Sequence, residues 1–274
     1  MDYAHKIKAR YRYAVILLKQ MVLTDFKLRY QGSVLGYVWS LLRPLFLFVI
    51  MYIVFVKFLR IGGDIPHYPV YLLMGIVLWN FFAEITSNSI SSIVMQRDLI
   101  RKLNFPKYVI LLAVAVAGLI NLLLNLVVIT IFLMFNHVPF TLSMLWLPAF
   151  ALEIFVFGIS IGTILGTVFV RLRDINYIWE VIAQALFYAT PIIYPVSLVF
   201  DRWPVVAKML LVNPIAQAMQ DVRYDVVTKQ QTLTLSGITH HWYITALPFA
   251  VVLLTLLVAI RLFKKRAPSF AEEV

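Results

Sequence analysis

The chain has 274 residues, of which 62% are apolar and 14% are charged, with a formal net charge of +11. Soluble domains contain roughly 45–50% apolar and about 25% charged residues, so this composition excludes an ordinary soluble domain and indicates a membrane protein. The absence of cysteine excludes disulfides, thiolate metal sites and thiol catalysis. Because a membrane-crossing helix needs about 20 residues, this length allows six spans with short connections and no second domain.

Residues 1–33 are predicted to form a cytoplasmic tail with an amphipathic helix at the membrane surface. The segment 7–30 carries too many charges to cross a bilayer, yet apolar side chains recur in it at three- and four-residue steps. These side chains are Tyr11, Val15, Leu18, Val22 and Phe26. Such spacing gives one apolar stripe on a helix whose remaining surface is basic, as in helices that lie in the membrane interface.

Six apolar stretches follow, each long enough to cross a hydrocarbon core of ~30 Å as a helix. They cover residues 34–58, 68–92, 109–135, 144–170, 175–195 and 242–263. The region between the last two stretches, about residues 196–241, contains several prolines, and its apolar run is too short to cross a membrane. This pattern predicts short re-entrant helices on the outer side. The predicted fold is therefore all-α and integral to the membrane, with residues 34–274 as one six-span domain.

The basic residues predict the orientation of these spans. Most of the 24 lie in residues 1–33, in the loop 93–108, at 171–173 and in the tail after 261, which share one side of a six-span topology. The positive-inside rule assigns that side to the cytoplasm, so both termini are expected there. Because topology accounts for most of the charge, we expect no nucleic-acid partner.

Two predicted spans carry polar side chains at helical spacing, so that each set lies on one face. They are Asn80, Glu84, Asn88 and Ser91 in the second span, and Asn176, Glu180, Gln184 and Tyr188 in the fifth. Polar groups within a membrane usually face a bundle interior or a wet cavity. The stripes are consistent with a polar pathway or with hydrogen bonds that hold the bundle together, and their occurrence as a pair favours a pathway.

Other intramembrane residues are predicted to be structural. Gly158, Gly162 and Gly166 form a small-residue ladder that favours close helix packing, and Asn121 and Asn125 share one face of the third span as interhelical hydrogen-bonding groups. Arg43 is expected to pair with Glu84 or Glu153. The sequence contains no phosphate-binding P-loop, no H-E-x-x-H pair and no G-x-S-x-G elbow, so we expect no catalytic residue and no metal site.

Four stretches form an ordered set of motifs along the chain. They are RYQGSVLGYVWSLLRPL at residues 29–45, DLIRKLNFP at 98–106, RLRD at 171–174, and PIIYP at 191–195 followed by Asn213 and Pro214. This set resembles the type-2 ABC exporter permeases that move polysaccharides. Members of that family are six-span permeases with an amphipathic N-terminal helix and re-entrant outer helices before the last span, which is the layout predicted above.

The resemblance implies a homodimer of permeases in the bacterial cytoplasmic (inner) membrane, paired with two copies of a separate nucleotide-binding subunit. ATP and Mg²⁺ would bind to that subunit, and this chain would hold no cofactor and no enzyme activity. The implied substrate is a lipid-linked glycan of the O-antigen type, with teichoic acid as the alternative within the family. The basic loop after the second span is the expected docking site for the ATPase subunit, through Arg97, Asp98, Arg101 and Lys102.

A pathway for an extended glycan needs hydrogen-bonding groups and aromatic planes on which sugar rings stack. Spans one, two and five supply both kinds of side chain. The candidate pathway residues are Trp39, Tyr52, Trp79, Asn80, Glu84, Gln184, Phe187 and Tyr188. Two other classes compete with this interpretation. A secondary transporter usually shows repeated halves, which this sequence does not display convincingly. A membrane-embedded glycan enzyme would need a cluster of carboxylates, whereas Glu84 and Glu180 are isolated in the sequence.

Overall fold

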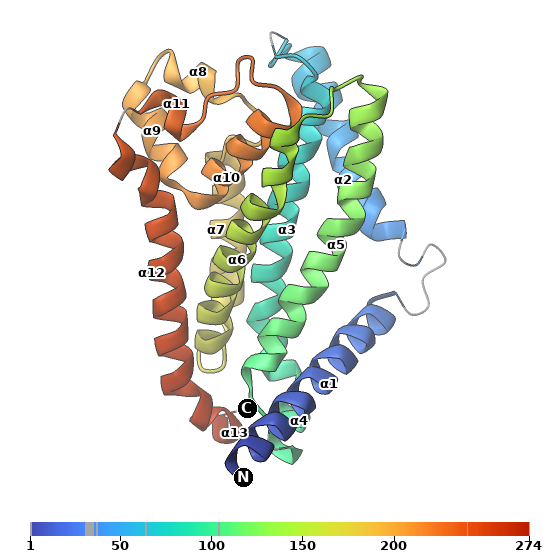
Figure 1. Ribbon diagram of the computed structural model, residues 1–274, viewed down its shortest axis with the longest axis vertical. Helices are drawn as coiled ribbons and strands as arrows, with labels where there is room; N and C mark the ends of the chain where they lie inside the picture. Colours follow the sequence, from blue (N-terminus) through green and yellow to red (C-terminus); the bar gives the residue numbers. More distant parts are fainter. Residues whose placement is uncertain are drawn as a thin grey trace.

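The computed structural model describes residues 2–30, 36, 38–63, 65–103, 105–239 and 241–273. Within these ranges the chain forms helices and no strand, as predicted (Figure 1). Five of the described helices are long and apolar enough to cross a membrane. They are α2 (Val38–Met51) with its π-helical continuation η1 (Tyr52–Phe58), α3 (Tyr68–Met95), α5 (Tyr108–Phe135), α6 (Leu147–Phe169) preceded by the 3₁₀ turn η2 (Leu142–Trp146), and α12 (Trp242–Arg266).

The predicted fifth span is shorter than expected. Helix α7 (Ile175–Ala189) has 15 residues, so it is about 22 Å long against a hydrocarbon core of ~30 Å. The predicted end at residue 195 is wrong because Pro191 disfavours a helical conformation at the residue before it. Thr190 is accordingly extended, with φ −81° and ψ 136°.

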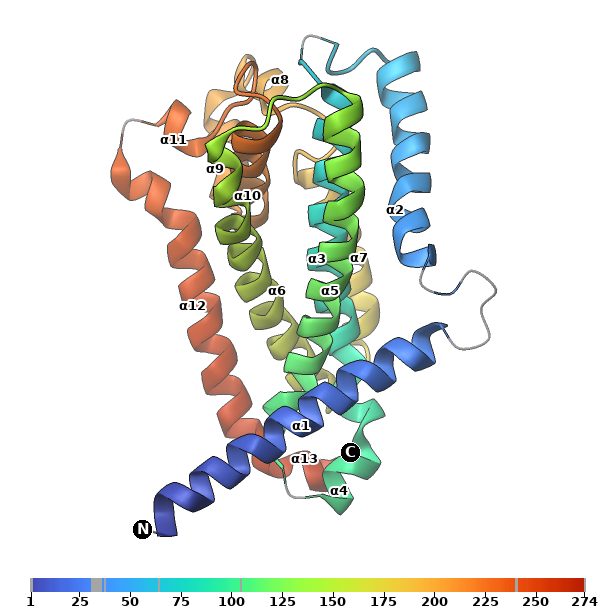
Figure 2. The same cartoon turned by 45° about the vertical axis from the view of Figure 1, so that its right-hand side comes forward.

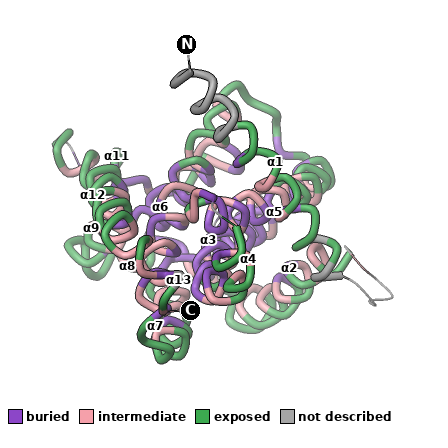
Figure 3. Tube along the Cα trace, turned by 90° about the horizontal axis from the view of Figure 1, so that it is seen from below, coloured by how far each residue is buried: buried purple, intermediate pink, exposed green. Residues whose placement is uncertain are grey.

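Helix α3 forms the centre of the bundle. Its first half, from Tyr68 to Trp79, is apolar on nearly all sides, and such a helix is stable only when it is surrounded by protein. Helices α5 and α6 pack along it, and α12 packs on the far side of α6 (Figure 1). Figure 3 shows the buried residues concentrated around α3, whereas α2 and α7 stand out from the same side of the bundle with largely exposed surfaces.

The glycine ladder of α6 allows this close packing. A Cβ atom on Gly162 would lie 2.6 Å from the Ser89 Oγ atom, and a Cβ atom on Gly166 would lie 2.6 Å from the Ser89 carbonyl oxygen. Real side chains do not approach so closely, so α6 reaches α3 only because these residues lack side chains. The predicted packing role of the ladder is confirmed.

Gly166→Ala is expected to lower the free energy of unfolding by about 1–3 kcal/mol, because the added methyl group meets backbone that cannot rotate away. Gly158→Ala is the matched control, since its Cβ atom would lie 3.5 Å from the nearest atom, an ordinary contact on Ile85. Thermal unfolding of the purified variants in detergent checks this difference. Equal unfolding temperatures for both would mean that α3 and α6 are less closely packed than described.

A cap covers one end of the bundle and is formed by residues 190–239. It contains short helices, as predicted for this region: α8 (Val196–Phe200), α9 (Pro204–Val212), α10 (Pro214–Val222) with its π-helical continuation η3 (Arg223–Val227), and α11 (Leu235–Ile238). The opposite end, here called the basic end, carries α4 (Arg97–Lys102), the α6–α7 turn, η4 (Ala267–Ser269) and α13 (Phe270–Glu273) (Figure 1). The basic loops that the sequence assigned to one side therefore do meet at one end.

Helix α1 (Asp2–Tyr30) runs obliquely across the basic end and packs on α5 (Figure 2). Ala14 and Val22 are buried, and Leu18 is partly buried, whereas Val15 of the predicted stripe is exposed. The side chains of Tyr11 and Phe26 lie outside the described residues. The segment is helical as predicted, but its predicted stripe is divided, because one apolar face packs on the bundle and a second is left uncovered.

Candidate functional site

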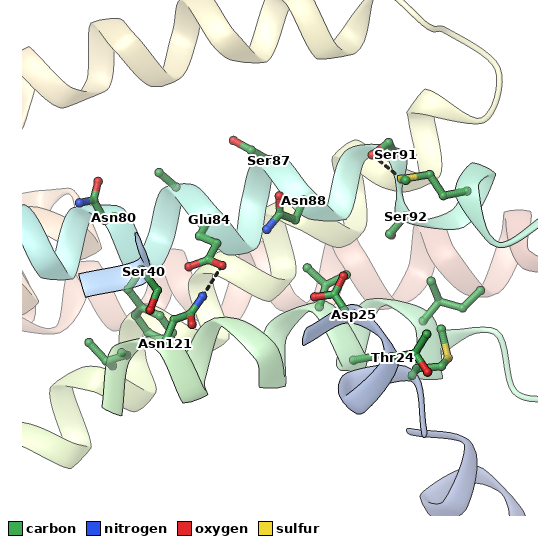
Figure 4. A pocket seen from close by; sticks show the side chains of 18 of the residues that line it. Thr24, Asp25, Ser40, Asn80, Glu84, Ser87, Asn88, Ser91, Ser92 and Asn121 are labelled. Atoms are coloured by element: carbon green, nitrogen blue, oxygen red, sulfur yellow. Dashed lines mark hydrogen bonds between the residues drawn. The ribbon is translucent and has the colours of Figure 1, made fainter. Parts of the chain in front are cut away.

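A cavity of about 1030 Å³ lies between α1, α2, α3 and α5 in the half of the bundle nearer the basic end (Figure 4). Helix α3 supplies one wall, and the polar residues of this wall include Asn80, Glu84, Ser87, Asn88 and Ser91. All four residues of the polar stripe predicted in the second span thus line one cavity. They do so because steps of three and four residues return to the same face of a helix.

Hydrogen bonds join the walls of the cavity. Asn121 on α5 donates through Nδ2 to Glu84 Oε1 at 2.6 Å (Figure 4). Asn125 donates through Nδ2 to the Asn121 carbonyl oxygen at 2.8 Å and to the Ser40 carbonyl oxygen on α2 at 3.4 Å. The predicted interhelical role of Asn121 and Asn125 is therefore confirmed, and Glu84 takes part in helix packing as well as lining the cavity.

Helix α1 closes the cavity toward the basic end. Leu17, Gln20, Met21, Thr24 and Asp25 line it from this side. None of these residues was predicted from the sequence, because nothing in the local pattern of α1 indicates which helices it crosses. The cavity thus has a polar wall on α3 and a floor of mixed polar and apolar side chains on α1.

The charged groups around the cavity are few. Arg43 on α2 lines it together with Glu84 and Asp25. Glu153, the other predicted partner of Arg43, does not line the cavity; it lies buried on α6 near Asp221 of the cap. Of the two predicted partners, only Glu84 therefore shares a site with Arg43.

The predicted pathway residues fall into separate groups. Trp39, Asn80 and Glu84 line the cavity. Trp79 is 5% exposed and packs in the core, with its ring centroid 5.7 Å from those of Phe82 and Phe187. Tyr52 lies on η1, where it packs against Phe48.

The remaining predicted pathway residues, Gln184, Phe187 and Tyr188, belong to α7 and do not line the cavity. Tyr188 is 57% exposed and Gln184 is exposed, whereas Phe187 is partly buried against Trp79. The structure thus separates the two polar stripes: that of α3 lines the cavity, and that of α7 lies on an uncovered face.

The predicted docking residues lie on α4 at the basic end. Arg97, Asp98, Arg101 and Lys102 are all exposed, whereas Ile100 between them is buried in an apolar cluster beneath the helix. A six-residue helix is too short to be stable alone, so this buried contact is what holds α4 to the bundle. Its four charged side chains therefore lie on the surface of the basic end.

The cap contains a second, smaller cavity of about 400 Å³, lined by Phe150 of α6 and by cap residues that include Asp221, Asp225 and Thr234. Burial raises the pKa of Asp221 to about 6, although Gln217 donates a hydrogen bond to this carboxyl group, and the nearby Asp225 carboxylate adds to the increase. This cavity shares no lining residue with the larger one.

Comparison with known proteins places this architecture in a family. The ABC-2 type transporter family matches residues 16–225, from within α1 to η3 in the cap. The chain belongs to the ABC-2 type transporter family. It is similar to the O-antigen export system permease protein RfbA of Klebsiella pneumoniae, with 31% identity over 270 residues that cover 97% of this chain and 98% of the relative. It is also similar to the protein of the same name in Myxococcus xanthus, with 28% identity over 98% of both chains.

As an ABC-2 type transporter, the chain is a multi-pass membrane permease, and the resemblance noted from its motifs is confirmed. The matched residues include α2, α3, α5 and all the cavity-lining residues of these helices. The cavity therefore lies within the part of the chain that characterises the family. With a volume of about 1030 Å³, against about 400 Å³ for the cap cavity, it is the candidate functional site.

Proposed function

We propose that the chain is the membrane-spanning permease subunit of an ATP-driven exporter that moves a lipid-linked polysaccharide of the O-antigen type. The polar wall of α3 carries this proposal, because amide, carboxylate and hydroxyl groups at membrane depth are costly unless they face water or a polar substrate. The family and the names of relatives that match nearly the full chain support the choice of substrate class.

The chemistry of the cavity suits a hydroxyl-rich chain. Asn80 and Asn88 each offer amide donors and acceptors, and Ser87 and Ser91 offer hydroxyl groups. Trp39 adds an aromatic plane to the opposite wall, on α2. Sugar rings present hydroxyl groups at their edges and apolar C–H groups on their faces, so both kinds of side chain have a use.

We propose six spans, with α7 as the fifth. Residues 190–195 extend α7 toward the cap in a non-helical conformation, and such backbone is tolerated at membrane depth where protein surrounds it. Ile192 and Ile193 in this segment are buried. The basic end then faces the cytoplasm by the positive-inside rule, with both termini inside and the cap on the outer side of the bacterial inner membrane. The short helices of the cap are the proposed re-entrant elements, and α1 is the proposed interface helix.

A homodimer accounts for the exposed polar stripe of α7. Asn176, Glu180, Gln184 and Tyr188 are exposed along one face of a helix whose only buried residue is Trp179. Contact with lipid would leave these polar groups without partners, so the face is expected to meet protein or water. A second copy placed against the side that carries α2 and α7 would enclose the α7 stripes of both copies around a central pathway (Figure 3).

We propose that α4 docks a separate ATPase subunit, because the sequence contains no P-loop. Arg101→Glu combined with Lys102→Glu is expected to reduce co-purification of that subunit, or to leave its ATP hydrolysis uncoupled from export. The reason is that charge reversal removes the electrostatic complementarity between α4 and the surface of the partner that it contacts. Co-expression with the ATPase subunit, followed by affinity purification and a glycan export assay, measures both.

Lys264→Glu combined with Lys265→Glu is the matched control, because it makes the same change in charge at the same end on exposed positions of α12. The control is expected to retain the complex. Normal assembly and export by the α4 variant would show that α4 is not the docking site. A wild-type chain that recruits no ATPase subunit, or whose ATP hydrolysis does not respond to lipid-linked glycan, would contradict the proposed function itself.

A further inference from the structure

Residues 267–273, here called the strap, follow α12 and run beneath the bundle to lie beside α4 (Figures 1 and 2). The strap comprises η4 and α13. Its anchor is Phe270, which is 1% exposed and lies in an apolar cluster with Ile100 of α4, Phe105 of the α4–α5 connection and Val170 at the end of α6. One side chain of the strap thus joins two different connections at the basic end.

Polar contacts fasten the strap to the same two connections. Lys107, which precedes α5, donates through Nζ to the Ala267 carbonyl oxygen at 2.6 Å. Arg171 in the α6–α7 turn donates to both carboxylate oxygens of Glu273, with Nε 2.8 Å from Oε2 and Nη2 bonded to Oε1. Two hydrogen bonds between one guanidinium and one carboxylate fix the relative orientation of the two side chains as well as the distance between them.

The Arg171–Glu273 pair stays ionised down to low pH. The hydrogen bonds from Arg171, together with smaller contributions from Ser269 and Arg266, lower the pKa of Glu273 to about 2, well below its ordinary value. The stabilisation from this group is complete above the ordinary carboxyl pKa and is lost as the pH falls toward 2. Arg171 is exposed and Glu273 is partly exposed, so the pair contributes little to global stability and its effect is local.

The backbone links α4 directly only to α3 and α5. Apart from the strap, α4 is connected to the end of α6, within the described part of the chain, only by the apolar packing around Ile100 and Val170, which allows sliding because it is non-directional. The strap adds a second route, since it contacts α4 through Phe270 and the α6–α7 turn through Glu273. Helix α7 begins directly after that turn, at Ile175.

We propose that the strap holds α4 in fixed register with the α6–α7 turn, so that a force applied to α4 also moves α7. This inference rests on the proposed function, in which α4 receives the ATPase subunit and α7 borders the pathway. The Arg171–Glu273 pair is then a positioning element that touches neither substrate nor nucleotide. Its loss would leave the permease folded and able to bind its partner, while ATP hydrolysis would drive export less efficiently.

The geometric part of the proposal is tested on the permease alone. The cysteine-free chain accepts single spin labels at Asp98 on α4 and Leu172 in the α6–α7 turn, both exposed. The distance distribution between the labels is expected to be narrow in the otherwise unchanged chain and broad in Glu273→Arg and in Arg171→Glu. The double variant that exchanges the two charges is expected to restore the narrow distribution. An unchanged distribution in the single variants would overturn the proposal.

The coupling part is tested with the same variants in complex with the ATPase subunit in proteoliposomes. Each single variant is expected to retain complex yield and basal ATP hydrolysis but to export severalfold less glycan per ATP, with recovery in the charge-exchange variant. Glu272→Arg is the matched control, because it reverses an exposed charge next to Glu273 in α13. Normal export per ATP in the single variants, or no recovery in the double variant, would overturn the proposal.

The two proposals fail in different ways. Loss of complex formation in the wild-type chain would contradict the proposed function, whereas the spin-label distances would still decide whether the strap positions α4. A wild-type complex that exports glycan, together with strap variants that couple normally, would leave the proposed function intact and remove only the role of the strap.

Discussion

Arg223→Gln is expected to lower the free energy of unfolding by at least about 3 kcal/mol, because it leaves three buried carbonyl groups without a donor, each worth about 1–3 kcal/mol. Arg223 is fully buried, and its guanidinium donates to the carbonyl oxygens of Tyr71 at 3.0 Å, Pro191 at 2.6 Å and Ile192 at 2.7 Å. The same group lies 3.8 Å from the centre of the Tyr71 ring. One side chain thus joins η3 and the segment 190–193 of the cap to α3.

Gly75→Ala tests the same contact without removing the guanidinium. A Cβ atom at this position would lie 2.1 Å from Arg223 Nη2 and 3.3 Å from the Ile192 carbonyl oxygen. The added methyl group must displace a side chain that four hydrogen bonds hold, so a comparable loss of stability is expected. Thermal unfolding monitored by fluorescence-detected size-exclusion chromatography measures both variants.

Matched controls exist for each change. Arg202→Gln removes an exposed arginine from the same cap, and Gly63→Ala adds a methyl group whose nearest atom would be 3.9 Å away. Both are expected to unfold at the wild-type temperature. If Arg223→Gln behaved like Arg202→Gln, the cap would be held by other contacts.

Asn88→Phe is expected to abolish most glycan export while leaving assembly with the ATPase subunit unchanged. Asn88 lines the cavity on the α3 wall, away from α4, so a large apolar side chain there removes both space and hydrogen-bonding groups. Thr130→Phe is the control, because Thr130 is exposed on α5 outside the cavity and its hydroxyl donates to its own helix at Leu126. Export in reconstituted vesicles and complex yield are measured in parallel. Normal export by Asn88→Phe would exclude the cavity as part of the pathway.

The exposed residues of α7 lie on a different surface from the cavity, so the same export assay is needed to test whether α7 also contributes to the pathway. Tyr188→Ala removes an exposed ring, so reduced export at a normal protein level would assign α7 to the pathway as well. Trp79→Ala does not answer this question, since Trp79 is packed against Phe82 and Phe187 and its removal is expected to affect folding. Reduced export in both Asn88→Phe and Tyr188→Ala would support a pathway that uses both stripes, within the proposed dimer.

Features that depend on residues close together in the chain could be predicted from the amino-acid sequence. The lengths of the apolar runs predicted the long helices, because the number of residues needed to cross a membrane follows from the helical rise. The steps between Asn80, Glu84, Asn88 and Ser91 predicted a shared face, and the spacing of Gly158, Gly162 and Gly166 predicted close packing. The end of α7 at Ala189 was predicted wrongly, at residue 195, although Pro191 restricts its neighbour Thr190 directly.

The surfaces that meet in the folded chain could not be predicted in this way. Trp79 and Asn80 are adjacent in the chain, yet one is buried in the core and the other lines the cavity, since successive residues of a helix point about 100° apart. The α1 floor of the cavity, the burial of Arg223 against Tyr71, and the contact between Glu273 and Arg171 join segments far apart in sequence. Such contacts depend on how complete helix surfaces pack against one another, and no local pattern of residues records that arrangement.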